Sequence, residues 1–254
     1  MKELEQTIRS HYPNVKTGNE VTESYLDFLQ HEYNADLSKM LFATSLCCDD
    51  INVSTNFRKV LTRPFSMGGL GGLPFSGFTG MVAFAHHVPD GGDAFIFYGP
   101  HIGMTDEGEL GKMRRPGQTQ LTNSCGALML ALQRLQQEPE VYVPTNTDLD
   151  YQQTLLERTV MPYKHRIITA ANPEKEITEV AYEEIHKKVK LLVRMSRQEF
   201  KCGRVFLLGG IIVNTSPEHQ DAVDIRNFEV VDTQESNENV QAFSILNSEA
   251  FKNL

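Results

Sequence analysis

The sequence has no tryptophan, only four cysteines and no apolar run long enough to cross a membrane. Four cysteines at irregular positions are too few for a disulfide framework. They favour a reducing, intracellular compartment, either the cytoplasm or an organelle such as a plastid if a targeting segment has been removed. The opening stretch MKELEQTIRSHYPN lacks the apolar core of a signal peptide. We therefore expect no membrane association and no structural disulfides.

Positive charge is also scarce. The chain carries 24 Lys and Arg against 33 Asp and Glu, which gives a formal net charge of -9. Nucleic-acid phosphates require a basic surface, so the balance argues against a nucleic-acid partner and favours a small solute. With 254 residues, 40% of them hydrophobic, the chain can bury a substantial core.

Apolar runs and amphipathic stretches alternate along the chain without repeats or a linker. This alternation predicts a single α/β domain over residues 1–254, with a mostly parallel central sheet flanked by helices. A helical N-terminal segment covers about 1–38 and a polar tail about 233–254. The predicted strands are 39–46, 81–88, 93–104, 204–216 and 228–232. The predicted helices are 20–34, 54–63, 124–137, 148–164 and 176–198.

Residues 65–81, FSMGGLGGLPFSGFTGM, contain six glycines among seventeen residues. The interleaved Phe and Leu side chains favour burial, so a mobile loop is a poor interpretation. Glycine allows close backbone approach, and we expect this segment to pack against a site or a neighbouring chain. No GxGxxG and no Lys-Ser/Thr accompanies the glycines, so the segment is not a phosphate-binding loop.

Three soft donors follow or begin predicted elements. Cys47 comes directly after the strand 39–46, His101 lies in the second half of 93–104, and Cys125 lies at the first turn of the helix 124–137. The carboxyl ends of parallel strands and the adjoining helix N-termini meet in one crevice, so these side chains can converge there. Two thiolates and an imidazole are donors that zinc prefers. The alternative is that both cysteines are ordinary core residues.

Five blocks, in this order, resemble the limiting-CO2-inducible protein B family, whose members are similar to β-carbonic anhydrases in fold and active site. The resemblance covers roughly residues 39–135. The blocks are SLCCDDIN, FSMGGLGGLPFSGFTG, AHHVPDGG, YGPHIGMTDEGELGKMRRPGQ and SCGAL.

The resemblance implies a β-carbonic-anhydrase-like zinc site with Cys47, His101 and Cys125 as the ligands of Zn2+. The implied reaction is the reversible hydration of carbon dioxide to bicarbonate by zinc-bound hydroxide, oriented by an Asp–Arg pair. The implied oligomer is a homodimer, and the apolar Gly-rich block suits such an interface.

The family pattern Cys-x-Asp assigns the carboxylate of the pair. It matches Cys47 and Asp49, but the doubled CCDD also allows Cys48 with Asp50. We prefer Asp49 because the family block continues with an acid and then an aliphatic residue, as CCDDI does.

The arginine of the pair departs from the β-carbonic anhydrase pattern. Those enzymes carry Cys-x-Asp-x-Arg, whereas the corresponding position here is Ile51. We assign the role to Arg58, in the helix predicted after the site, with Arg63 and Arg115 as rivals. The assignment requires Asp49 to precede that helix, because nine helical steps would place Asp49 and Arg58 on opposite faces.

Two further roles are open. His86 and His87 are candidates for a proton relay because imidazole titrates near neutral pH, although either could simply be a structural histidine. Phe65, Leu73 and Phe75 are candidates for the pocket wall, or ordinary core residues.

Two other functions compete with the hydratase. In a metal-free thiol hydrolase, Cys125 would be the nucleophile and His101 its base, which leaves the CCDDI stretch without a role. The chain could instead be a non-catalytic zinc-binding bicarbonate or scaffold subunit of the same fold, since the arginine of the ordinary motif is missing.

Overall fold

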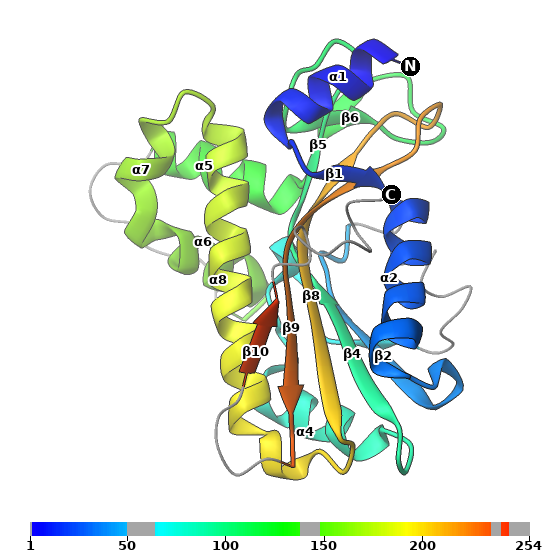
Figure 1. Ribbon diagram of the computed structural model, residues 1–254. Coiled ribbons are helices and arrows are strands. Elements are labelled where there is room, and N and C mark those ends of the chain that lie inside the picture. Colours follow the sequence, from blue (N-terminus) through cyan, green and yellow to red (C-terminus); the bar gives the residue numbers. More distant parts are fainter. Residues whose placement is uncertain (1, 50–63, 138–147, 235–239, 244–254) are drawn as a thin grey trace.

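The computed structural model describes residues 2–49, 64–137, 148–234 and 240–243 (Figure 1). Its main sheet has the strand order β1-β9-β8-β4-β2-β3, with β10 also paired to β9 and β5 also paired to β8. Its strands are β1 (Val15–Thr17), β2 (Met40–Ser45), β3 (Phe65–Ser66), β4 (Asp93–Tyr98), β5 (His101–Gly103), β8 (Arg204–Asn214), β9 (Ala222–Asp232) and β10 (Val240–Phe243). A separate two-stranded sheet joins β6 (Lys112–Arg114) to β7 (Leu121–Asn123).

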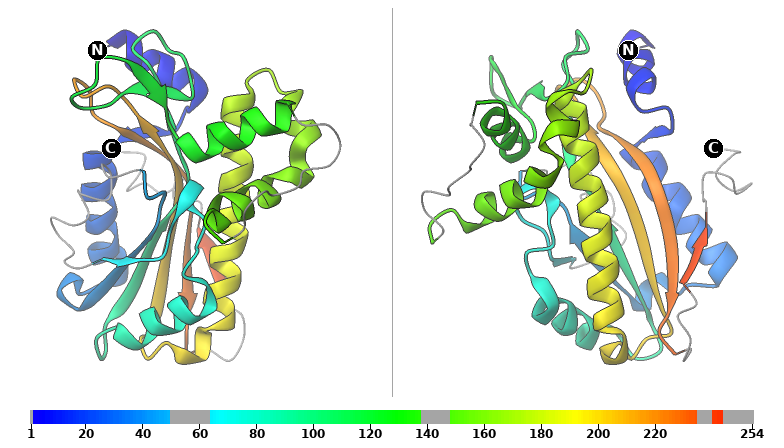
Figure 2. Two further views of the ribbon diagram at one scale, coloured as in Figure 1. Left: turned by 180° about the vertical axis from the view of Figure 1, so that it is seen from behind. Right: turned by 90° about the vertical axis from the view of Figure 1, so that its left-hand side faces the viewer.

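Helices cover both faces of the main sheet. Helix α8 runs along one face and α2 lies on the other, as the two views of Figure 2 show. The α-helices are α1 (Lys2–His11), α2 (Gly18–Tyr33), α4 (Gly77–His87), α5 (Gly126–Gln137), α6 (Tyr151–Val160), α7 (Lys164–Ile168) and α8 (Pro173–Met195). The short 3-10 helices are η1 (Leu37–Lys39), η2 (Leu70–Gly72), η3 (Met161–Tyr163) and η4 (Arg197–Glu199).

The α/β class with a central sheet flanked by helices is confirmed. Strands β3, β2, β4, β8 and β5 pair in parallel, whereas β9 is antiparallel to β8, β1 and β10. The sheet is therefore mixed. A short connection, residues 215–221, joins β8 to β9, and a connection of that length returns the chain antiparallel instead of crossing over.

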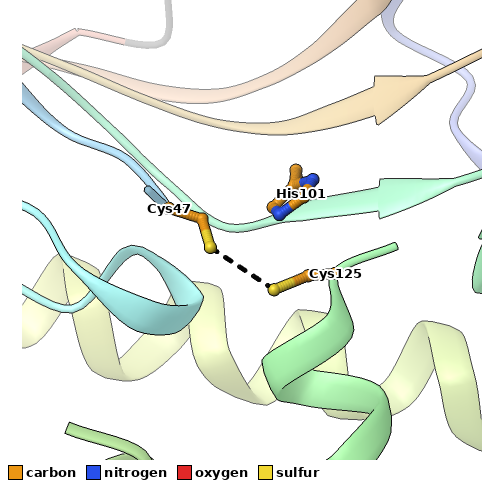
Figure 3. Close-up of side chains that lie close together, drawn as sticks. All are labelled: Cys47, His101 and Cys125. Atoms are coloured by element: carbon orange, nitrogen blue, oxygen red, sulfur yellow. Dashed lines mark hydrogen bonds between the residues drawn. The ribbon is translucent and has the colours of Figure 1, made fainter. Parts of the chain in front are cut away.

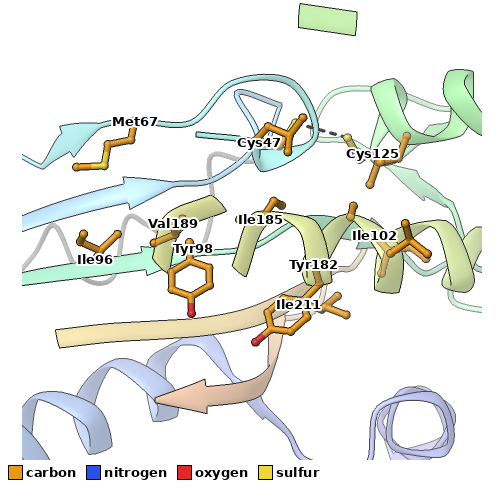
Figure 4. Packing of buried hydrophobic residues seen from close by; sticks show 14 of the residues in the cluster. Cys47, Met67, Ile96, Tyr98, Ile102, Cys125, Tyr182, Ile185, Val189 and Ile211 are labelled. Atoms are coloured by element: carbon orange, nitrogen blue, oxygen red, sulfur yellow. Dashed lines mark hydrogen bonds between the residues drawn. The ribbon is translucent and has the colours of Figure 1, made fainter. Parts of the chain in front are cut away.

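Strand β4 shows why its sequence is apolar throughout. Phe95 and Phe97 belong to the core on the α2 side, whereas Ala94, Ile96 and Tyr98 belong to the core on the α8 side. Successive side chains of a strand point to opposite faces, so a strand buried on both sides is a continuous apolar run. Figure 4 shows the α8 side of this packing.

The strand predicted over 81–88 is wrong, because residues 81–87 belong to helix α4 and Val88 follows its end. Met81, Phe84 and Ala85 are its buried residues, a spacing of three and four that is typical of one helix face. The run is short and apolar, and such runs do not separate strand from helix by composition.

The other predicted elements agree with the structure at their centres. Helices α2 and α5 and strands β2 and β8 lie within a few residues of their predicted bounds. The stretch 93–104 divides into β4 and β5, and β9 begins earlier than predicted, at Ala222. The helix predicted over 54–63 lies outside the described residues.

The Gly-rich segment packs closely against the two strands that lead to the candidate site. A Cβ atom on Gly68 would lie 2.1 Å from the carbonyl oxygen of Leu46, and one on Gly72 would lie 2.5 Å from that of Gly99. The Ser45 hydroxyl donates a hydrogen bond to the Gly72 carbonyl at 3.0 Å. The segment therefore fixes the backbone just before Cys47 and just before Pro100 and His101.

We predict that Gly68→Ala lowers the free energy of unfolding by about 2 kcal/mol or more, because the added methyl group overlaps rigid backbone. Gly203→Ala is the matched control: both glycines have ordinary φ angles, but nothing lies within 4 Å of a Cβ on Gly203. The control should change stability by less than about 0.5 kcal/mol. Guanidinium unfolding measures both variants, and equal midpoints would contradict the packing argument.

Candidate metal centre

Three segments bring the candidate ligands to one edge of the main sheet. Strands β2 and β4 are parallel and in register, with Ser45 opposite Tyr98. Cys47 lies two residues after β2 ends, and His101 begins β5 shortly after β4 ends. Cys125 directly precedes α5, on the loop that follows β7. The predicted convergence of strand ends and a helix start is what the structure shows (Figure 3).

The three side chains form one compact buried cluster. Their donor atoms all lie within 4.8 Å of one another. The residues are 3%, 1% and 0% exposed for Cys47, His101 and Cys125. The two sulfurs are 3.5 Å apart, close to the separation of about 3.8 Å expected when two thiolates share a tetrahedral zinc at about 2.3 Å. Donor types and spacing both fit a zinc ion.

The His101 ring is oriented by a side chain from the end of β8. Its Nδ1 lies 2.6 Å from Asn214 Oδ1, while the Asn214 Nδ2 donates to Asp221 at 3.1 Å. Because Asp221 accepts from the amide nitrogen, the amide oxygen faces the ring and accepts from Nδ1–H. The neutral imidazole then carries its lone pair on Nε2, as a metal ligand requires.

The two cysteines share one hydrogen bond. The contact between the two sulfurs, in which either can donate, lowers the pKa of Cys125 and, together with burial, raises the pKa of Cys47. Backbone N–H groups of Ala127 and Leu128, in the first turn of α5, also lower the pKa of Cys125, against the opposing effect of burial. The helix start thus favours the thiolate at Cys125.

Asp49 forms an ion pair with Arg115 beside this cluster. The Arg115 Nη2 lies 2.8 Å from Asp49 Oδ2 and also donates to the Asn123 carbonyl at 3.0 Å. The Nη1 donates to the Thr122 hydroxyl. The carboxylate lies next to the start of α5, since a Cβ on Gly126 would be 4.0 Å from Asp49 Oδ2. The β6–β7 hairpin therefore supplies the arginine and fixes its position.

This placement bears on two open choices: which cysteine of the CCDD stretch belongs to the site, and which arginine pairs with Asp49. Cys47 belongs to the buried cluster, whereas Cys48 is exposed. Arg115, one of the two rival arginines, pairs with Asp49. Arg58, Arg63 and Asp50 lie outside the described residues, so the assignment of Arg58 stays a prediction.

His86 and His87 do not join the cluster. Both lie in the last turn of α4, a few residues before β4 begins, and thus near the amino end of that strand. His86 pairs with Glu199 at 2.8 Å, and His87 Nδ1 binds the Ala83 carbonyl at 2.6 Å. The cluster follows the opposite, carboxyl end of β4, and among the described residues neither imidazole contacts Cys47, His101 or Cys125. Their role as a proton relay stays a prediction.

The three candidate wall residues pack as core. Leu73 is 2% exposed and belongs to the core cluster on the α8 side. Phe65 packs against Phe84 with tilted rings whose centroids are 5.6 Å apart, and the ring centroids of Phe75 and Tyr151 are 5.9 Å apart. Phe65 and Phe75 are partly buried against the same core cluster, so the packing supports the ordinary-core alternative for all three residues.

Asn214 and Asp221 are the residues that sequence reasoning missed. They lie in the stretch NTSPEHQD after an apolar strand. A polar residue at the carboxyl end of a buried strand is the one signal that could have suggested Asn214, and it is a weak one.

The described helices include none that is both long and apolar enough to cross a bilayer.

A mixed sheet flanked by helices, with a buried Cys2His cluster at the carboxyl edge of its parallel strands, defines a class of α/β protein whose site could hold a metal ion. The family model for the limiting CO2-inducible proteins B/C, β-carbonic anhydrases, matches residues 16–232. The chain belongs to this family.

Solved structures agree with this membership. The chain is similar to PtLCIB4, described as a homolog of the limiting CO2-inducible protein LCIB, with a TM-score of 0.86 and 28% identity over 94% of this chain and 99% of that one. It is also similar to LCIB itself, with a TM-score of 0.66 and 18% identity over 92% of this chain and 96% of that one, a likeness that shows the fold alone. A comparison with curated protein sequences returns no match.

We predict that the purified chain holds about one zinc ion and that Cys47→Ser lowers its zinc affinity by more than about 100-fold. Loss of a direct donor should cost more than the 10- to 100-fold cost of losing an outer hydrogen-bond partner. Cys48→Ser is the matched control, because this neighbouring thiol is exposed and outside the cluster. Elemental analysis after equilibration with a zinc buffer measures both, and equal loss in the two variants would contradict the assignment of Cys47.

Proposed function

We propose that this chain is a zinc-dependent carbonic anhydrase that interconverts carbon dioxide and bicarbonate. The observation that carries the proposal is the Asp49–Arg115 ion pair beside the buried Cys47–His101–Cys125 cluster. The family description, which names β-carbonic anhydrases, supports the same reaction. The cluster alone would support only metal binding, and the pair adds an oriented general base.

Cys47, His101 and Cys125 would hold the ion. A zinc ion held there would supply hydroxide near neutral pH, because binding to zinc lowers the pKa of water. The three donors are buried, so the protein would exclude bulk water from their side of the site.

Asp49 would position the nucleophile. Its carboxylate accepts the hydrogen bond from the attacking oxygen, which turns a lone pair of that oxygen toward the carbon of the substrate. Arg115 holds Oδ2 at 2.8 Å, and Thr122 and the Asn123 carbonyl hold Arg115. A bond between an arginine and a carboxylate is charge-assisted and directional, so it fixes the orientation of Asp49 and keeps the carboxylate available for the attacking oxygen.

A thiol hydrolase has less support. Its nucleophile would be Cys125, which is 0% exposed. The sulfur of Cys125 lies 3.5 Å from a second sulfur, that of Cys47. The alternative of a non-catalytic zinc-binding subunit keeps the same cluster and differs in rate alone, so an activity measurement decides between that alternative and the enzyme.

We predict that Asp49→Ala lowers the rate of carbon dioxide hydration by about 100-fold or more, the typical contribution of a positioned general base. Arg115→Leu should lower the rate by about 10-fold or more, because the carboxylate loses a charge-assisted partner. Both variants should retain zinc, because neither residue belongs to the cluster. Stopped-flow hydration with elemental analysis of the same preparation measures rate and metal together.

Arg114→Leu is the control for this prediction. Arg114 is the sequence neighbour of Arg115, but its Nη2 pairs with Glu218 at 2.5 Å on the surface. Its loss should change the rate by less than about twofold, since exposed ion pairs contribute little. If the wild-type chain holds zinc but shows no measurable hydration of carbon dioxide, the enzyme proposal is wrong and the non-catalytic zinc-binding subunit is favoured.

We further propose a homodimer. The Gly-rich block that first suggested an interface packs within the chain, against Leu46 and Gly99. Exposed apolar side chains on α6 are better support, since Tyr151 and Leu155 are 52% and 43% exposed and lie one turn apart.

We predict that light scattering gives twice the chain mass of 28.7 kDa, and that Leu155→Glu shifts the protein toward the monomer. A wild-type monomer at the same concentration would refute the dimer.

A further inference from the structure

A second hollow lies away from the metal centre, between the carboxyl half of α8 and strands β8 and β9. Its volume is about 640 Å³, within the range of pockets that hold small organic ligands. None of its lining residues belongs to the Cys47–His101–Cys125 cluster. In Figure 1 this part of α8 is the lower half of the helix.

Cationic side chains line the hollow. Lys187, Lys190, Arg194 and Arg197 contribute four positive charges, against two carboxylates in the lining, in a chain whose net charge is -9. Lys187 pairs with Glu184 at 2.8 Å and Lys190 with Glu229 at 3.0 Å.

Arg194 differs from these lysines. Within the described ranges no side chain forms an ion pair or hydrogen bond with its guanidinium, and the residue is exposed. A guanidinium presents a planar set of donors that suits a carboxylate, phosphate or sulfonate group. Arg194 is therefore available to an anion at the pocket.

The second polar feature is a buried carboxylate. Glu229 is 4% exposed. Its Oε1 receives Lys190 at 3.0 Å and lies 3.6 Å from His186 Nε2. Its Oε2 has no hydrogen-bond partner among the described residues. A buried acceptor without a partner is costly, so this oxygen favours a donor brought by a ligand.

Four apolar side chains also line the hollow. Leu191, Val193, Leu207 and Val231 provide its hydrocarbon surface. Leu191 is 46% exposed although it lines the hollow, and burial of such surface by a ligand is favourable.

We propose that this pocket binds a small amphipathic organic anion. Its anionic group pairs with Arg194, its apolar body covers Leu191 and Leu207, and an N–H or O–H group donates to Glu229 Oε2. The proposal is independent of the hydration reaction, because it uses none of the residues that hold the metal or orient the nucleophile.

Anilinonaphthalene sulfonate is a suitable probe, because it carries a sulfonate, an aromatic body and one N–H donor. We predict saturable fluorescence enhancement with one site per full-length chain. Leu191→Glu should weaken binding by about 10-fold or more, because it replaces apolar surface with a carboxylate that repels the sulfonate. Arg194→Ala should weaken binding by about 10-fold, the effect of one charge-assisted hydrogen bond. Inorganic phosphate alone should compete poorly, and decanoate should compete well.

Met195→Glu is the matched control for Leu191→Glu. Both residues are exposed apolar side chains of α8, but Met195 is 57% exposed and does not line the pocket. The Met195→Glu variant should bind the probe with the same affinity as the wild type. Equal binding by Leu191→Glu and Met195→Glu, or unsaturable binding at many sites, would overturn the proposal. Circular dichroism establishes that all variants are folded, and zinc content should be unchanged in each.

Discussion

The parallel register of β2 and β4 is the constraint on which the rest of the site depends. Ser45 lies opposite Tyr98, so the segments that follow β2 and β4 leave the sheet side by side. Cys47 and His101 lie on these segments and therefore come close together. A slip of one residue would turn every side chain of β2 to the other face and separate the donors. Gly68 and Gly72 hold this register from outside the pair, because their lack of a side chain lets backbone press against backbone.

The convergence of the three candidate metal donors could be predicted from the sequence, and the residues that support them could not. Cys47, His101 and Cys125 carry a distinctive chemistry and stand where predicted elements end or begin. Arg115 and Asn214 have common side chains, and their roles come from tertiary contacts. Arg115 reaches Asp49 across 66 sequence positions, and Asn214 reaches His101 across 113. No local pattern encodes such pairings, so the sequence could name Arg115 as a rival of Arg58 but could not show that Arg115 pairs with Asp49.

The fold class was predictable for a similar reason, and its details were not. Apolar strands alternate with amphipathic helices, and this alternation alone indicates a covered α/β sheet. Helix α4 was missed because its eight apolar and histidine residues look like a short strand, although Met81, Phe84 and Ala85 follow the helical spacing. The antiparallel direction of β9 depends on the short 215–221 turn after β8, whose polar composition shows a connection but not its direction.

The metal donors and the proposed orienting arginine belong to different parts of the chain. Strand ends and a helix start carry the donors, whereas a two-stranded hairpin at the margin of the fold carries Arg115. Such a margin can drift in sequence while the core stays intact. On the proposed function, a relative could lose hydration activity through substitutions in the hairpin alone and still keep the three residues that would bind the metal. The presence of those cysteines and the histidine in a sequence would then not distinguish active relatives from inactive ones.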